Sequence, residues 1–268
     1  MAIDKSTFYR QFILTKHRER VPVSWRSVHL GKWILGHHNS LRTQQLVDYS
    51  EKFIGWALGF AVSRNCGNLE REMRLPLMCF CEGRISQLDQ FIGSMSGAFA
   101  VFVVEGEGVR VMPDAAGRLP IVYDTCSKSA ASSALLLDSS GLKREALYKL
   151  EIEARGPGYF PFGLTAYEGF RRLLPNHTLF LPSGNLKRCW PPPLPRILSL
   201  ETVARRIIKC ISQLMIKIGE HYPVVLGLTG GIDSRVILSC AHKSLERNSL
   251  SLFTLDTDEE DVRIARRI

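Results

Sequence analysis

The sequence predicts an α+β N-terminal domain followed by an incomplete α/β domain with a parallel sheet, and three observations support this fold class. Short strand-like runs separated by turn residues dominate residues 8–125. A proline-rich segment interrupts the chain at residues 190–195, and beyond it apolar strands alternate with helical patterns. Such alternation is typical of parallel βαβ units. We therefore expect a first domain at residues 1–189, a linker at 190–198 and a second domain at 199–268.

The elements of the first domain are predicted from apolar runs bounded by glycine, proline and small polar residues. Residues 105–108 (Glu-Gly-Glu-Gly) and 182–185 (Pro-Ser-Gly-Asn) predict two hairpin turns. Helical periodicity predicts helices at residues 44–52 and 85–95. The predicted strands cover residues 12–14, 32–35, 56–60, 98–104, 109–112, 178–181 and 186–189.

The second domain is predicted to begin with a helix and to contain two strands. Trp190-Pro191-Pro192-Pro193-Leu194-Pro195 can continue neither a strand nor a helix, so we interpret it as the linker. The elements predicted after it are an amphipathic helix at 200–219, a strand at 224–228, a helix with apolar positions 236, 237, 240 and 241, a strand at 250–255, an acidic loop at 256–261 and a final helix start. A parallel sheet needs about four to six strands with both faces covered. With two strands, this domain is expected to be incomplete.

The composition is that of an ordinary soluble globular protein. The chain has 268 residues, of which 45% are hydrophobic and 23% charged. It has no apolar stretch of membrane-spanning length and no signal-peptide core, so we expect neither a membrane span nor export. The seven cysteines are scattered. Cys79 and Cys81 form a C-x-C without a second pair at zinc spacing, which favours free thiols in a reducing cytoplasm.

The formal net charge of +9 is spread over the chain. Basic residues cluster in four separate regions, at 16–20, 171–172, 205–206 and 266–267. A nucleic-acid binder usually concentrates its positive charge on one face, with aromatic side chains interleaved. We therefore interpret the basic clusters as solvated surfaces, with a contribution to holding phosphates or an acidic partner, and do not expect nucleic-acid binding.

The most informative motif is Leu-Thr-Gly-Gly-Ile-Asp-Ser-Arg at residues 228–235, between a predicted strand and a predicted helix. Two glycines can adopt positive φ and let the backbone approach an anion, and the N–H groups and dipole of the helix start favour negative charge there. Thr229 and Ser234 add hydroxyl donors, and Asp233 can hold the magnesium that accompanies a polyphosphate. The alternative interpretation is local capping of the helix.

The motif is not a Walker A loop, because no Gly-Lys-Ser/Thr follows, and Ser234 lacks the glycines of a nucleophile elbow. It resembles the S-G-G-x-D-S loop of N-type ATP pyrophosphatases, with Thr229 in place of the first serine. That resemblance implies cleavage of ATP between its α and β phosphates and adenylation of a carboxylate or carbonyl. The implied ATP-binding residues are Leu228, Thr229, Gly230, Gly231, Ile232, Asp233, Ser234 and Arg235, and the implied magnesium ligand is Asp233.

Taken together, both halves of the chain resemble the asparagine synthase family. Residues 95–100 (Met-Ser-Gly-Ala-Phe-Ala) resemble its L-S-G-x-F-A strand entry, and residues 113–123 resemble its D-x-x-G-x-x-P-L-Y-Y hairpin. Residues 162–177 resemble the segment that ends in its L-x-P-G-H turn. After the phosphate loop, Asp261-Val262 with Ala265 resembles its acidic helix start. The resemblance covers roughly residues 90–268.

The family resemblance implies a glutaminase-like (Ntn-type) domain of layered antiparallel sheets and then a nucleotide-binding domain with a parallel sheet. It implies an amide ligase that adenylates a carboxylate, admits an amine and releases AMP and pyrophosphate. The family's glutaminase nucleophile is a cysteine exposed when Met1 is removed, and here Ala2 takes that place. We therefore expect no glutaminase activity, an expectation that glutamate release by the pure protein would refute. The replacement of the nucleophilic cysteine by Ala2 favours a similarity to β-lactam synthetases and lasso-peptide cyclases.

Besides these relatives, two further alternatives remain open for the function. The chain is also consistent with a truncated or split non-catalytic member that binds nucleotide weakly or needs a partner chain or a homodimer to complete the second domain. A tRNA-modifying ATP pyrophosphatase is a further alternative. For a ligase, the expected partners are ATP and a small carboxylate or peptide, and no catalytic residue is assigned.

Individual polar residues outside the glycine pair carry weaker predictions. Arg235 is expected either to reach a phosphate or carboxylate or to form a surface salt bridge. Asp114 and Arg118 are expected to stabilise a turn near a substrate pocket. Asp256, Asp258, Glu259 and Glu260 are expected to form a solvated loop, with a metal role as the alternative, while His37, His38 and His177 are expected to be structural.

Overall fold

The computed structural model describes residues 8–48, 52–63, 74–75, 92–126, 128–138, 141–146, 160–189, 197–220, 222–245, 250–256 and 258–268. The chain divides into two compact units. One unit comprises Met1–Ala61 and Met73–Pro193, and the other comprises Val62–Glu72 and Leu194–Ile268. The linker predicted at 190–198 overlaps residues 190–196, which lie outside the described residues, so the domain boundaries stay a prediction.

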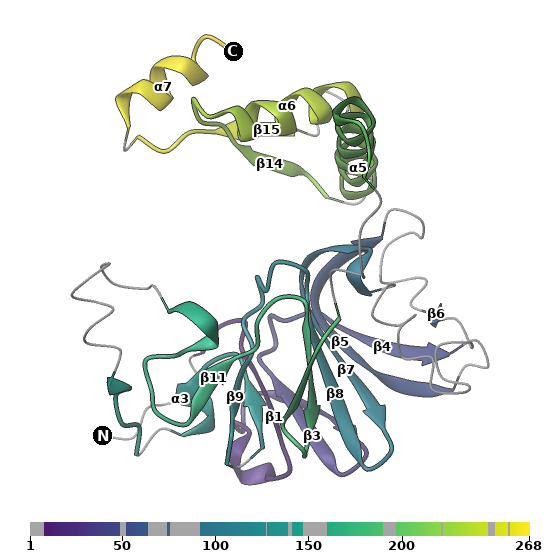
Figure 1. Cartoon of the computed structure of the whole chain (residues 1–268), viewed down its shortest axis with the longest axis vertical. Helices are drawn as coiled ribbons and strands as arrows, with labels where there is room; N and C mark the ends of the chain where they lie inside the picture. Colours follow the sequence, from purple (N-terminus) through teal and green to yellow (C-terminus); the bar gives the residue numbers. More distant parts are fainter. Residues whose placement is uncertain are drawn as a thin grey trace. The chain divides into compact units, whose positions relative to one another are not determined.

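Two large, mostly antiparallel sheets build the first unit (Figure 1). Among the described residues, six strands lie in the order β11-β9-β10-β1-β3-β2 and seven in the order β13-β12-β8-β7-β5-β4-β6. The strands of the six-stranded sheet are β1 (Phe12–Thr15), β2 (Arg26–Leu30), β3 (Trp33–His37), β9 (Val122–Asp124), β10 (Ala130–Ala131) and β11 (Phe170–Arg172). Those of the seven-stranded sheet are β4 (Thr43–Asp48), β5 (Phe53–Ser63), β6 (Arg74–Leu75), β7 (Met95–Glu105), β8 (Gly108–Pro113), β12 (His177–Leu181) and β13 (Asn185–Arg188).

The main core of the first unit lies between these two sheets. Because side chains alternate along a strand, every second residue faces the opposite sheet. Phe12 and Leu14 of β1 point into this core together with Phe102 of β7 and Val111 of β8. The rings of Phe12 and Phe102 meet edge to face, with centroids 5.3 Å apart. The layered antiparallel architecture predicted for the N-terminal domain is therefore confirmed in its coarse form.

A smaller apolar cluster covers the other face of the six-stranded sheet. Ile13, which lies between the two core residues of β1, packs there with Ile34 of β3 and Val122 of β9. The short helix α3 (Ala134–Leu137) adds Leu136 and Leu137. Helix α3 begins at a Ser133 cap whose side chain accepts a hydrogen bond from the Leu135 N–H. Both faces of β1 are thus buried, which explains its uninterrupted apolar sequence.

The helix predicted at residues 44–52 is wrong, because residues 43–48 form strand β4. This strand pairs antiparallel with β5, where Gln45 lies opposite Trp56 and Leu46 opposite Gly55. Leu46 and Asp48 are buried while Val47 between them is more exposed, which is the two-residue period of a strand. Of the helix predicted at 85–95, residues 85–91 lie outside the described residues, residues 92–93 are helical, and Met95 already belongs to β7.

The hairpin expected at residues 113–123 is also wrong. Strand β8 ends at Pro113 in the seven-stranded sheet, whereas β9 begins at Val122 in the six-stranded sheet. The intervening residues therefore connect the two sheets instead of turning back within one of them. The other two predicted hairpins are confirmed, since β7 pairs with β8 and β12 with β13, both antiparallel.

The second unit contains helices α5 (Leu200–Gly219), α6 (Ile232–Ser244) and α7 (Glu259–Ala265) and strands β14 (Val224–Gly227) and β15 (Leu250–Phe253). Strands β14 and β15 pair in parallel, from Val224 opposite Leu250 to Gly227 opposite Phe253. The predicted helix at 200–219 is confirmed, and the Thr202 N–H donates to its Ser199 cap at 3.3 Å. None of the described helices is both long and apolar enough to cross a membrane.

The acidic loop predicted at 256–261 is wrong in its second half, because α7 already begins at Glu259. Asp258 caps this helix by accepting hydrogen bonds from the Glu260 and Asp261 N–H groups at 2.9 and 3.2 Å. The three acidic residues of the first turn, Glu259, Glu260 and Asp261, lie at the positive end of the helix dipole. The acidic residues that follow strand β15 therefore form the start of a helix.

Candidate functional site

The loop at residues 228–235 leaves the carboxyl end of β14 and enters α6. Leu228 is buried, its N–H donates to the Phe253 carbonyl at 2.8 Å, and its own carbonyl accepts from Thr254 Oγ1 at 2.9 Å. The end of β15 therefore fixes the point at which the loop begins. Three residues, 229–231, connect Leu228 to Ile232 at the start of α6.

The structure brings Thr229 and Ser234 together, as expected for two donors of one site. Their hydroxyl oxygens lie 3.1 Å apart, and the Thr229 N–H donates to Ser234 Oγ at 3.1 Å. The Gly231 N–H donates to Thr229 Oγ1 at 3.2 Å. These hydrogen bonds lie within the loop, as the capping interpretation requires, and they hold the two hydroxyls beside each other.

The expectation that the glycine pair adopts positive φ is wrong. Gly231 has φ −69° and ψ 158° as the residue before α6, and neither glycine lies in the left-handed region. At Gly230 a Cβ would lie 2.7 Å from Cδ1 of Ile264 and 3.0 Å from Oδ1 of Asp261, so a larger residue there would displace these two side-chain ends. The close packing of α7 on the loop therefore favours glycine at this position.

Asp261 is a site residue that the sequence analysis did not select. Its Oδ1 accepts a hydrogen bond from the Gly230 N–H at 2.7 Å. The two residues are far apart in the sequence and meet because β15 places α7 beside the loop. The signal that pointed to Asp261 was its position at an acidic helix start after the second strand.

The N-terminus of α6 carries the remaining donors of the loop. The first amides of an α-helix have no acceptor within the helix, and Gly231 provides no side-chain cap. Among the described residues, no acceptor faces the amides of Ile232, Asp233 and Ser234. Three adjacent N–H donors at the positive end of a 13-residue helix form a site suited to an anion.

Among the described residues Arg235 forms no surface salt bridge, and its expected contact with a phosphate or carboxylate stays a prediction. Its Nε donates to the Gly231 carbonyl at 3.2 Å, so the guanidinium lies back on the loop. This contact holds positive charge beside the helix start. The side chain is otherwise exposed, which leaves its remaining N–H groups directed to solvent.

Asp233 lies exposed in the first turn of α6, as a magnesium ligand beside a polyphosphate would. Within the described part of the chain, no group of three or more His, Cys, Asp or Glu side chains is arranged to hold a metal ion. Among the other acidic candidates, Asp258 caps α7 and Glu260 pairs with Arg263. Ala2, Cys79 and Cys81 lie outside the described residues.

In the first unit, Asp114 has the turn-stabilising contacts that were expected of it. The side chain is 1% exposed, and its carboxylate accepts hydrogen bonds from the N–H groups of Phe99, Ala116, Arg118 and Leu119 at 3.0 to 3.3 Å. Asp114 and Arg118 border a cavity of about 440 Å³, which Phe60, Met95 and Ser96 also line. The two predicted residues thus lie together at a pocket, and the carboxylate itself is committed to the backbone.

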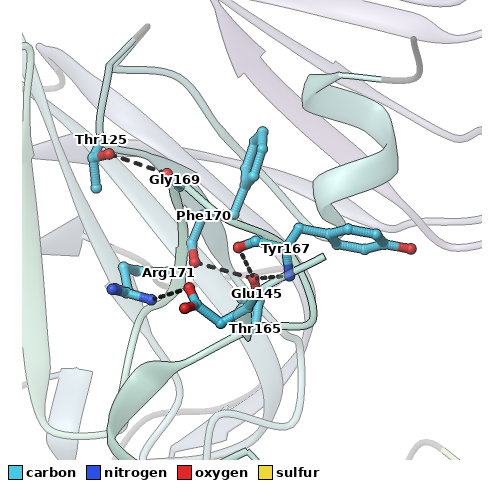
Figure 2. Close-up of polar contacts among 7 residues, drawn as sticks. All are labelled: Thr125, Glu145, Thr165, Tyr167, Gly169, Phe170 and Arg171. Atoms are coloured by element: carbon cyan, nitrogen blue, oxygen red, sulfur yellow. Dashed lines mark hydrogen bonds and ion pairs between the residues drawn. The ribbon is translucent and has the colours of Figure 1, made fainter. Parts of the chain in front are cut away.

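The segment at 162–177 that carries part of the family resemblance is folded around Thr165 (Figure 2). Thr165 Oγ1 lies 3.0 Å from the carbonyl oxygens of both Tyr167 and Phe170, and it accepts from the Tyr167 N–H at 3.2 Å. Arg171 pairs with Glu145 at 3.5 Å, and the Thr125 hydroxyl donates to the Gly169 carbonyl at 3.1 Å. These contacts tie the segment to its neighbours and give it a structural role.

The three histidines considered at the sequence level make local contacts. His37 is buried in β3, its Nδ1 lies 3.2 Å from the His38 carbonyl, and burial lowers its pKa from the ordinary value. His38 Nδ1 lies 2.6 Å from Ser40 Oγ, and His177 Nδ1 lies 3.0 Å from the Pro175 carbonyl. These contacts agree with the structural role expected for all three.

Comparison with known proteins adds no family to these observations: no protein-family profile and no curated protein sequence matches the chain.

Proposed function

We propose that the loop at residues 228–235 binds the polyphosphate of ATP together with Mg²⁺, and that β14 and β15 belong to a nucleotide-binding sheet. The observation that carries this proposal is the start of α6, where three adjacent amides follow a parallel strand, have no acceptor among the described residues and lie beside the hydroxyls of Thr229 and Ser234. Helix N-termini of this kind bind phosphate groups through their N–H donors and dipole.

The donor set of the loop fits a polyphosphate better than it fits a free metal ion. Backbone amides and hydroxyls donate hydrogen bonds, which phosphate oxygens accept. Asp233 is the single carboxylate within the loop. Mg²⁺ usually keeps several waters and is bound by one or two carboxylates plus substrate phosphates, so Asp233 would hold magnesium only alongside the nucleotide.

For the reaction, we propose an ATP-dependent amide-forming ligase of the asparagine-synthase type, with a small carboxylate or peptide as the acid. Bound ATP would supply the adenylyl group that activates this carboxylate. In such a reaction the amides of Ile232, Asp233 and Ser234 hold the negative charge of the phosphates that leave. Thr229 and Ser234 orient those phosphates through their hydroxyls. The free thiols at Cys126 and Cys240 support a cytoplasmic site of action.

Titration calorimetry with Mg-ATP tests the binding step. Ser234→Ala removes a hydroxyl that touches Thr229, and we expect it to weaken binding about tenfold, since a hydrogen bond to a charged group contributes about 1.5–3 kcal/mol. Ser239→Ala removes an exposed hydroxyl further along α6 and is the matched control. The proposal fails if wild type binds no Mg-ATP, or if the two variants weaken binding equally.

A second candidate, a non-catalytic nucleotide binder, is favoured by one specific observation. The Thr229 and Ser234 hydroxyls already bond to each other and to loop backbone, so a phosphate must replace those contacts before it gains its own. Pyrophosphate release separates the two candidates. A ligase releases pyrophosphate from ATP when a suitable acid and amine are present, whereas a pure binder retains ATP intact.

A further inference from the structure

Asp261 contacts the proposed phosphate loop from outside the strand–loop–helix unit. Its Oδ1 lies 2.7 Å from the Gly230 nitrogen, which is the short distance of a hydrogen bond to an ionised group. The N–H groups of the two residues that flank Gly230 bond within the loop, that of Thr229 to Ser234 Oγ and that of Gly231 to Thr229 Oγ1. Among the described residues, Asp261 is thus the side chain that ties the middle of the loop to a separate element.

Helix α7 holds this carboxylate in a defined place. Asp258 accepts a hydrogen bond from the Asp261 N–H at 3.2 Å, which fixes the backbone of Asp261 in the first turn. One turn later, Ile264 packs so closely on the loop that a Cβ at Gly230 would lie 2.7 Å from its Cδ1 and displace it. Asp261 itself is half-buried, whereas Glu259 and Glu260 beside it are exposed. The loop and α7 therefore meet over a small, closely packed contact.

The contact determines which amides are available to an anion. The Gly230 N–H is committed to Asp261 and the Gly231 N–H to Thr229, so the donors that remain are those of Ile232, Asp233 and Ser234. A glycine pair is intrinsically free to rotate, and the fixed Gly230 peptide limits that freedom. A site whose donors are held in place before binding spends less free energy on ordering when the ligand arrives.

We propose that Asp261 is a positioning residue for polyphosphate binding, acting through the Gly230 peptide and touching no phosphate itself. This inference rests on the proposed ATP site and deepens it. It assigns to α7 the task of holding the loop in its binding geometry. The property that matters most is the acceptor oxygen of Asp261, because this oxygen orients the amide, while the charge adds strength to the bond.

Inorganic pyrophosphate binding to the full chain, measured by calorimetry with and without Mg²⁺, tests this role. Asp261→Ala removes the acceptor, and we expect about tenfold weaker binding, since losing one charge-assisted hydrogen bond has an effect of that order. Asp261→Asn keeps an acceptor oxygen at the same place and is expected to restore affinity to within about threefold. Glu201→Gln, an exposed change of equal charge on α5, is the control and is expected to bind as wild type.

Each other outcome overturns the inference in a recognisable way. Equal affinity of Asp261→Ala and wild type means that the contact only packs α7, even if the variant melts at a lower temperature. A loss in Asp261→Asn as large as that in Asp261→Ala, and seen only with Mg²⁺, means that Asp261 is a metal ligand. Absence of pyrophosphate binding by wild type refutes the proposed ATP site and this inference together, whereas normal wild-type binding with unaffected variants refutes this inference alone.

Discussion

At the scale of single residues, the buried carboxylate of Asp114 shows how one side chain holds a connection between two sheets. It accepts hydrogen bonds from three backbone N–H groups of the turn that links β8 to the six-stranded sheet and from the Phe99 N–H of β7. Backbone donors that are buried without an acceptor are costly. The turn therefore depends on this carboxylate much more than on its sequence neighbours.

We predict that Asp114→Ala lowers the free energy of unfolding of the first unit by about 3 kcal/mol or more, because several buried donors lose their acceptor at once. Urea denaturation followed by tryptophan fluorescence measures this change. Glu19→Ala removes an exposed carboxylate of the same unit and should stay within about 0.5 kcal/mol of wild type. A loss no larger than that of Glu19→Ala would contradict the account.

His37 predicts an acid-sensitive first unit. Burial lowers the pKa of His37 below 6.5 in the folded chain, with Arg26 and His38 adding to the effect and the His38 carbonyl opposing it. Below pH 6.5 the unfolded chain therefore binds a proton that the folded chain resists, and stability falls as the pH falls. Above about pH 7 the histidine is neutral in both states, and its contribution no longer changes.

The check is to measure the urea midpoint of unfolding at several pH values between pH 7.5 and pH 5, a range that spans the ordinary histidine pKa of about 6.5. His37→Asn should reduce the decline on the acid side, whereas His29→Gln, at an exposed position of β2, should keep it. If stability falls equally in wild type and His37→Asn as the pH is lowered, groups other than His37 cause the acid sensitivity.

The motif at residues 228–235 can be selected from the sequence as a candidate phosphate loop, which stays a prediction, whereas its contact with α7 cannot. Thr229, Asp233 and Ser234 stand within one short motif, so their spacing alone indicates a common site. Asp261 lies far along the chain, and only the parallel pairing of β14 and β15 brings it to Gly230. The close packing at Gly230 could not be predicted for the same reason, because it comes from Ile264 on that distant helix.

At the scale of elements, β5 and β7 approach each other so closely that glycine is required between them. Gly97 has φ +142°, and a Cβ there would lie 2.1 Å from the Phe60 carbonyl oxygen. The neighbouring atoms are backbone, so they cannot move aside as the end of a flexible side chain would. This explains the glycine in the motif at residues 95–100.

Gly97→Ala is expected to destabilise the first unit by about 3 kcal/mol or more, since it combines a backbone clash with a strained φ. Gly93→Ala is the matched control, because a Cβ at Gly93 meets nothing within 4 Å. Thermal unfolding of both variants by circular dichroism provides the comparison. Equal melting temperatures would show that the strands separate easily at this point.

Elements with a long, regular pattern were predictable, and short ones were not. The 20-residue helix α5 combines an amphipathic period with a Ser199 cap and was expected over the observed residues. Strands β9, β10 and β11 have only two or three residues each, too few to display a period. Strand β4 was mistaken for a helix because its pairing with β5, and not its own sequence, determines its conformation.

At the scale of the whole molecule, the second unit leaves much of its apolar surface exposed in the part of the chain that the structure describes. Between residues 197 and 268, the described apolar residues that are fully buried are Leu228, Cys240 and Ala241. Val225 and Leu255 are 64% and 66% exposed. Parallel strands are normally buried on both faces, so these side chains form an unusual surface for such a sheet.

We predict that the chain binds the dye ANS in its native state, because the dye recognises exposed apolar surface. Val225→Ser combined with Leu255→Ser should lower the ANS fluorescence. Val23→Ser, which changes a fully exposed but isolated side chain in the first unit, should leave it unchanged. Fluorescence that is equal in all three proteins would mean that the apolar surface of the second unit is covered.

The central claim is that the start of α6 binds a polyphosphate, and amide chemical shifts measured during a pyrophosphate titration test it most directly. We predict that the largest shifts fall on the amides of Ile232, Asp233 and Ser234, the donors without an acceptor among the described residues. The Gly230 amide, which remains bonded to Asp261, should move less. If pyrophosphate binds to saturation without shifting the amide signals of residues 228–235, or if the largest shifts fall in the first unit, the claim is contradicted.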